Sequence, residues 1–93
     1  SEDGIFVITA CVSERSGDLL SDPVVVNRGF VMPENADYLS DIKQIVVNSV
    51  DQTNVRADVN NTELAAAIKK AVKNFIYKKT KQNPVVMALI TRV

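Results

Sequence analysis

Two runs of apolar, mostly β-branched residues near the two ends of the chain constrain its fold most strongly. One is Ile5 to Val12 (IFVITACV), which follows Gly4, and the other is Val85 to Val93 (VVMALITRV), which follows Pro84. Apolar runs of this length, bounded by turn residues, are typical of buried strands. The sequence therefore predicts a first strand at 5–12 and a last strand at 85–93.

A third extended run is centred on Val24 to Val26, with Pro23 at its start, where no ladder hydrogen bond is lost. The pattern can continue through Arg28-Gly29-Phe30-Val31. Between this run and the first strand lies Ser16-Gly17-Asp18, a combination suited to a hairpin connection. We expect the first two strands to pair as an antiparallel hairpin.

A first helix is predicted after Pro33, with Asn35 as its N-cap and Asp37 in the first turn, where a carboxylate complements the helix dipole. The polar stretch from Asp51 to Asn60 ends it. Its buried stripe follows from apolar spacing of three and four residues and comprises Leu39, Ile42, Ile45, Val46, Ser49 and Val50.

A second helix is predicted to open at Asn60, because Asn60 followed by Glu63 resembles a capping box. Asn83-Pro84 ends the helical region, since proline disfavours helical geometry in the residue before it. Its apolar face is formed by Leu64, Ile68, Ala71, Val72, Phe75 and Ile76.

The fold class that follows is α+β, in the order β-β-α-α-β, with a small three-stranded sheet and two helices packed on one face. We expect residues 1–93 to form a single domain. Both outer runs are apolar on both faces: Ile5 and Val7 oppose Phe6 and Ile8, and the last strand behaves likewise. Helices on one face leave the other uncovered, so the sequence predicts an apolar contact surface for a partner.

Composition excludes several kinds of chemistry. The chain has no histidine and one cysteine, Cys11, so it lacks the imidazole of common nucleophilic sites and the ligands of a zinc centre. We expect no catalytic residue, no metal and no cofactor in this chain. Asp37 and Asp41 lie at helical spacing, but carboxylates near a helix start usually complement its dipole. The lack of a membrane-spanning apolar run and of paired cysteines predicts a cytoplasmic protein without membrane contact.

The zero net charge conceals a strong asymmetry. Residues 1–63 carry eleven acidic and four basic side chains, whereas residues 64–93 carry seven basic and none acidic. Lys69, Lys70, Lys73 and Tyr77 share the outer side of the second predicted helix. Two readings stay open: a solvated helix face, or an RNA-contacting surface in which lysines bind phosphates and the tyrosine stacks on a base.

Arg28-Gly29-Phe30 matches the start of the RNA-contacting strand of RNA-recognition motifs, but Val31 and Met32 do not continue that pattern. We therefore favour a structural reading, in which Gly29 permits a close backbone approach and Phe30 anchors the strand end in the core.

The segments together resemble the C-terminal domain of bacterial ribonuclease J. The resemblance rests on Val25 to Val31 (VVNRGFV), on Phe75 to Pro84 (FIYKKTKQNP) before a terminal strand, and on Glu2-Asp3-Gly4 before the first strand. It covers nearly the whole chain. The residues that carry it most specifically are Arg28, Gly29, Phe30, Val31, Lys79, Thr80 and Pro84.

The resemblance implies a parent enzyme with a metallo-β-lactamase core and a β-CASP domain, which holds zinc and acts on RNA as a 5′-to-3′ exonuclease and endonuclease. The domain resembled here supports oligomer assembly and activity without supplying metal ligands. The partners implied are the rest of the parent enzyme, a second subunit of a homo-oligomer, and RNA through the parent. Any zinc is expected in the parent's catalytic part.

Overall fold

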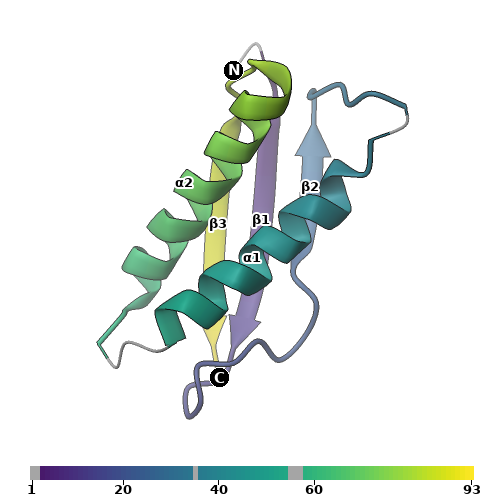
Figure 1. Cartoon of the computed structure of the whole chain (residues 1–93). Coiled ribbons are helices and arrows are strands. Elements are labelled where there is room, and N and C mark those ends of the chain that lie inside the picture. The colour runs from purple at the N-terminus through teal and green to yellow at the C-terminus, as the bar shows by residue number, and fades with distance from the viewer. Residues whose placement is uncertain (1–2, 35, 55–57) are drawn as a thin grey trace.

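Three strands and two helices follow one another in the order β-β-α-α-β, as predicted (Figure 1). The computed structural model describes residues 3–34, 36–54 and 58–93. Its elements are β1 (Ile5–Val12), β2 (Val24–Arg28), α1 (Tyr38–Asn54), α2 (Asn61–Thr80) and β3 (Val85–Arg92). None of the helices in these described ranges is long and apolar enough to cross a bilayer.

The sheet has the strand order β2-β1-β3, with β1 at its centre. β1 pairs antiparallel with β2, where Ile5 lies opposite Arg28, so the predicted hairpin is confirmed. β1 pairs parallel with β3, where Ile5 lies opposite Val85. The chain passes through both helices between β2 and β3, and this crossover returns β3 to the far side of β1 in the same direction.

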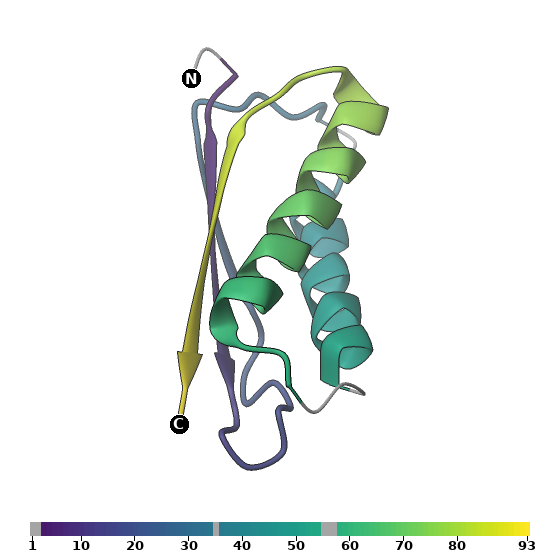
Figure 2. The same ribbon diagram turned by 90° about the vertical axis from the view of Figure 1, so that its left-hand side faces the viewer.

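Both helices cover the same face of the sheet, and the core lies between the two layers (Figure 2). Alternation along β1 puts Phe6 and Ile8 into this layer, where neither is exposed. The helices contribute the apolar stripes that the sequence predicts. The buried apolar residues are Phe6, Ile8, Ala10, Val12, Phe30, Ile42, Val46, Val50, Leu64, Ile68, Val72, Ile76 and Val86.

β2 is shorter than its sequence pattern allows and ends at Arg28. The Asn27 side chain turns the chain there, because its Nδ2 donates to the Phe30 carbonyl at 2.8 Å and its Oδ1 accepts from the Phe30 N–H at 3.1 Å. Gly29 adopts a φ of 79°, which glycine tolerates. The turn directs Phe30 into the core and leaves Val31 81% exposed.

α1 begins at Tyr38 and is capped by Asp37, whose Oδ1 accepts from the Ser40 N–H at 3.1 Å. The predicted cap, Asn35, lies outside the described residues. The helix continues to Asn54, beyond the predicted end near Asp51. Polar composition did not stop it, since buried Val50 still holds the last turns against the core.

α2 begins as predicted, because the Asn60 side chain accepts from the Glu63 N–H at 2.8 Å. It ends at Thr80, earlier than Asn83-Pro84. Lys81 stops it by adopting the left-handed conformation, with a φ of 60°, and its N–H donates to the Tyr77 carbonyl at 2.8 Å. A lysine is an unusual residue for this cap, so sequence patterns miss it.

Candidate functional site

No described residue covers the face of the sheet that is turned away from the helices (Figure 2). Its outer strands present Val24 and Val26 from β2, which are 54% and 43% exposed, and Met87 and Leu89 from β3, which are 45% and 51% exposed. We call these four residues, together with half-buried Val7, the open sheet face. The structure thus confirms an exposed apolar patch on the second face of the predicted sheet, which it shares with exposed Thr9 and Arg28.

The strand register joins these side chains into rows. Val26, Val7 and Met87 are cross-strand neighbours, and Val24 and Leu89 flank Thr9 in the next row. An antiparallel or mixed sheet that faces water normally carries polar side chains on that face. Contiguous apolar patches instead mark contact surfaces, and each valine or leucine that a partner buries fully contributes about 1.5–3 kcal/mol. The open sheet face therefore has the chemistry of a protein interface.

The basic residues predicted on α2 lie together on its outer side. Lys69, Lys70 and Lys73 line one shallow hollow of about 340 Å³ with Ala66 and Asn74. Within the described parts of the chain, none of these three lysines forms an ion pair. They are available to an anionic partner, as the RNA-contacting reading requires.

Tyr77 extends this basic surface toward the end of α2. It is 44% exposed and lines a second hollow, of about 470 Å³, with Lys73 and Lys78. The Lys81 ammonium lies 5.1 Å from the centre of the Tyr77 ring, a cation–π arrangement. A base that stacks on this face of the ring has to displace Lys81, a residue that the sequence analysis did not single out.

The residues that carry the family resemblance meet at one end of the sheet, around Gly4. The Gly4 carbonyl accepts from the Val85 N–H at 2.9 Å, directly after Pro84, which is among the fully buried side chains. On its other side, Gly4 approaches the Arg28–Phe30 backbone so closely that a Cβ on Gly4 would lie 2.5 Å from the Phe30 nitrogen. This end of the sheet is a structural joint.

Phe30, Thr80 and Lys79 complete the same end of the molecule. The Phe30 ring packs against Phe6 with 5.1 Å between ring centres, so Phe30 lies in the core, as the structural reading of the Arg28-Gly29-Phe30 segment expects. The Thr80 hydroxyl donates to the Ile76 carbonyl at 2.8 Å and accepts from the Gln82 N–H at 3.1 Å, which fixes the end of α2. Lys79 lines a hollow beside Val31 and Tyr38.

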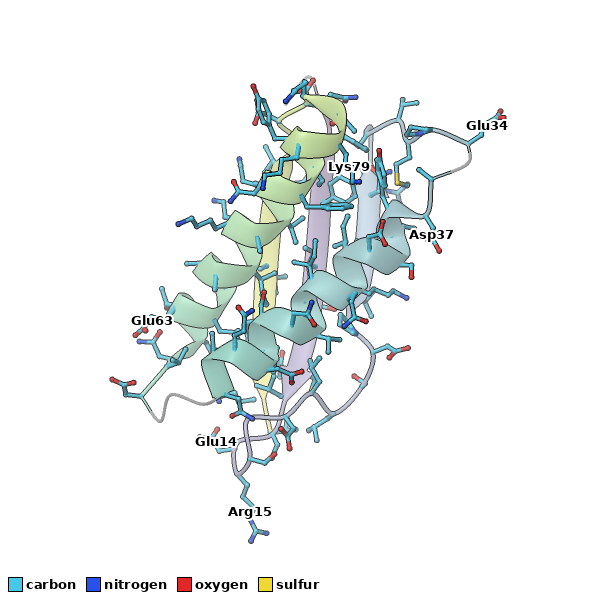
Figure 3. All side chains as sticks on the ribbon, viewed as in Figure 1. Glu14, Arg15, Glu34, Asp37, Glu63 and Lys79 are labelled. Atoms are coloured by element: carbon cyan, nitrogen blue, oxygen red, sulfur yellow. The ribbon has the colours of Figure 1, made fainter. Side chains whose placement is uncertain are left out.

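The described side chains form no cluster that could hold a metal ion. No group of three or more histidine, cysteine or carboxylate residues comes together in residues 3–34, 36–54 and 58–93. The labelled charged residues point outward at separate places: Glu14 and Arg15 in the loop after β1, Glu34 in the loop before α1, and Glu63 at the start of α2 (Figure 3).

A polar hollow of about 330 Å³ lies at the end of the molecule where β3 finishes, and sequence patterns did not indicate it. Arg92 holds one wall, because its Nε donates to the Asn61 side chain and its Nη2 donates to the Val59 carbonyl at 3.4 Å. Glu14 and Arg15 also line the hollow. With these contacts, Arg92 ties the end of β3 to the start of α2.

Comparison with known proteins gives consistent matches along the chain. The family model described as "Ribonuclease J C-terminal domain" matches residues 1–93. Ribonuclease J2 of Bacillus subtilis (strain 168) is 28% identical over 94 residues, which cover 100% of this chain and 17% of that protein. Ribonuclease J 1 of Streptococcus pyogenes serotype M3 is 26% identical over 91 residues, 97% of this chain and 16% of that protein. The chain thus spans about a sixth of the length of these relatives.

Proposed function

This chain belongs to the ribonuclease J C-terminal domain family, and we propose that it is the non-catalytic C-terminal domain of a ribonuclease J-like enzyme, where it supports oligomer assembly and activity. The parent acts on RNA in the cytoplasm as a 5′-to-3′ exonuclease and endonuclease, with its zinc ions in the part of the enzyme outside this chain. The match of the family over residues 1–93 supports this placement.

The open sheet face is the observation that carries the assembly role. Four apolar side chains on its two outer strands are between 43% and 54% exposed. Burying them against a second subunit or the body of the parent removes apolar surface from water, which favours association. Since an enzyme whose subunits fail to associate loses contacts that hold its active form, activity is expected to fall with assembly.

Deleting this domain from a full-length parent tests the proposal. We expect the mass measured by light scattering to fall to that of a smaller assembly and the ribonuclease activity to fall with it. The undeleted parent at the same concentration is the control, because association depends on subunit concentration. A truncated parent with an unchanged assembly state and full activity would contradict the proposal.

A second candidate function is direct RNA contact by the outer side of α2. It is favoured by the unpaired state of Lys69, Lys70 and Lys73 among the described residues and by the neighbouring Tyr77. Phosphate contacts make affinity fall steeply with salt. Titration of the chain with single-stranded RNA at low and moderate salt tests it: binding that the triple Lys→Ala variant retains, or no binding at low salt, excludes this function.

A further inference from the structure

The outer edge of β3 carries unpaired backbone groups. At the two ends of the strand, the Val85 N–H donates to the Gly4 carbonyl at 2.9 Å and the Val93 N–H donates to the Val12 carbonyl at 3.1 Å. In a parallel pair, residues whose N–H and C=O face the neighbouring strand alternate with residues whose groups face away. The N–H and C=O of Val86, Ala88 and Ile90 therefore point out from the sheet, and no described residue bonds to them.

Nothing in the sequence of β3 protects this edge. Natural sheets blunt their edges with short strands, prolines, bulges or charged side chains. β3 has eight residues, VVMALITR, and its one charged side chain is Arg92 at the far end. The central part of the strand is thus free to pair with another extended segment.

The helix layer is wider than the sheet that it covers. Two helices packed side by side occupy about 16–20 Å, whereas three strands occupy roughly 14 Å. In Figure 1, the first half of α2 lies beyond β3, on the side away from β1. A groove of about 240 Å³ lies there, lined by small Ala65 and Ala66, by Lys69, and by residues 86–89 of β3. One more strand widens the sheet to about 19 Å and matches the helix layer.

We propose that the β3 edge and the groove beneath α2 bind an extended segment of another polypeptide as a fourth strand. In this segment, apolar and acidic residues alternate. On the open side of the sheet, its side chains lie beside Met87 and Leu89, which favours apolar residues. On the helix side, they lie beside Lys69, which favours carboxylates. The absence of acidic residues from positions 64–93 gives this part of the chain the complementary charge.

A second copy of this chain fits the edge poorly. If β3 paired with β3 of a second copy, the α2 helices of both copies would have to lie over the two paired strands. The first α2 already projects past the β3 edge, so the two helices would crowd each other (Figure 1). Such pairing also brings together two segments that each carry seven basic and no acidic residues. Crowding and charge both favour a strand without a helix of its own.

Ala88→Pro blocks the edge selectively. Proline removes the outward N–H of Ala88 but leaves the bonds between β3 and β1, which involve the alternate residues. Ala66→Gln fills the groove from the α2 side, and Ala67→Gln is its matched control, because Ala67 does not line the groove. Circular dichroism and thermal unfolding establish that each variant is folded, so a failure of Ala88→Pro to fold leaves the Ala66/Ala67 pair as the test.

The probe is a capped peptide of alternating valine and glutamate, with a valine–lysine version as the charge control. We expect the acidic peptide to bind the 93-residue chain and to protect the amides of Val86, Ala88 and Ile90 from exchange. The affinity of the peptide for Ala88→Pro and for Ala66→Gln should fall by about tenfold or more. Ala67→Gln keeps full affinity. No binding, a preference for the lysine version, undiminished binding to the folded variants, or dimerisation that Ala88→Pro abolishes would overturn the proposal.

This test is separate from that of the assembly role. Substitutions at Val24 and Val26 lie on β2, and β1 separates them from the β3 edge. We therefore expect them to leave peptide binding unchanged whether or not the parent assembles through the open sheet face.

Discussion

At the scale of single residues, Gly4 is the point at which three segments of the chain meet. The start of β1, the Arg28–Phe30 turn and the start of β3 all meet at its backbone, and its φ is 88°. Both the conformation and the close approach require the absence of a side chain. Gly4, the last residue of the opening segment in the family resemblance, thus has a structural role in this joint.

Gly4→Ala is predicted to destabilise the fold by more than about 2 kcal/mol, because the new Cβ meets backbone atoms that cannot move independently. Gly29→Ala is the matched control: its φ is 79°, but the nearest atom to its new Cβ is the Gly4 Cα at 3.5 Å. It should cost about 1 kcal/mol, the strain term alone. Urea unfolding of both variants measures the difference, and equal losses would contradict the account of the joint.

Single residues also show how far sequence reasoning reaches. Asn60 was predictable as a cap because asparagine followed by glutamate three positions later is a strong local signal. Lys81 was not, because a lysine in the left-handed conformation is stabilised by its surroundings rather than by its own preference. The grouping of Lys69, Lys70, Lys73 and Tyr77 on one side of α2 followed from helical periodicity alone.

At the scale of elements, the order and the buried faces could be predicted, but the sheet topology could not. Apolar spacing gives the stripe of each helix and the alternation of each strand, since both depend on local geometry. Whether β3 pairs with β1 or β2, and in which direction, depends on the path of the whole crossover. For the same reason the sequence did not reveal the free edge of β3 or the groove beneath α2.

The N-terminus of α2 offers a direct test of the element boundaries. Asn60→Ala removes the side-chain acceptor of the Glu63 N–H and should destabilise the chain by about 1 kcal/mol. Asn74→Ala, at an exposed position within the same helix, should change stability by less than about 0.5 kcal/mol. Thermal or urea unfolding compares the two. An Asn60→Ala variant as stable as Asn74→Ala would mean that this cap contributes nothing to the fold.

At the scale of the whole molecule, the helices shield one side of the sheet and leave the open sheet face on the other. The net charges of residues 1–63 and 64–93 are opposite and sum to zero, so the region of α2 and β3 is strongly basic. The parts of the molecule suited to binding are therefore an apolar face, a basic helix side and a strand edge. Apolar strands on both faces predicted the first, charge asymmetry predicted the second, and only the structure revealed the third.

The mass of a full-length parent that carries Val24→Lys and Val26→Lys tests the central claim most directly. Both side chains lie on the open sheet face, so two buried ammonium groups oppose any contact there. Val31→Lys is the control, because Val31 is 81% exposed and lies outside the sheet. We predict a smaller assembly by light scattering for the double variant and an unchanged mass for the control. An unchanged mass for a folded double variant would contradict assembly through this face.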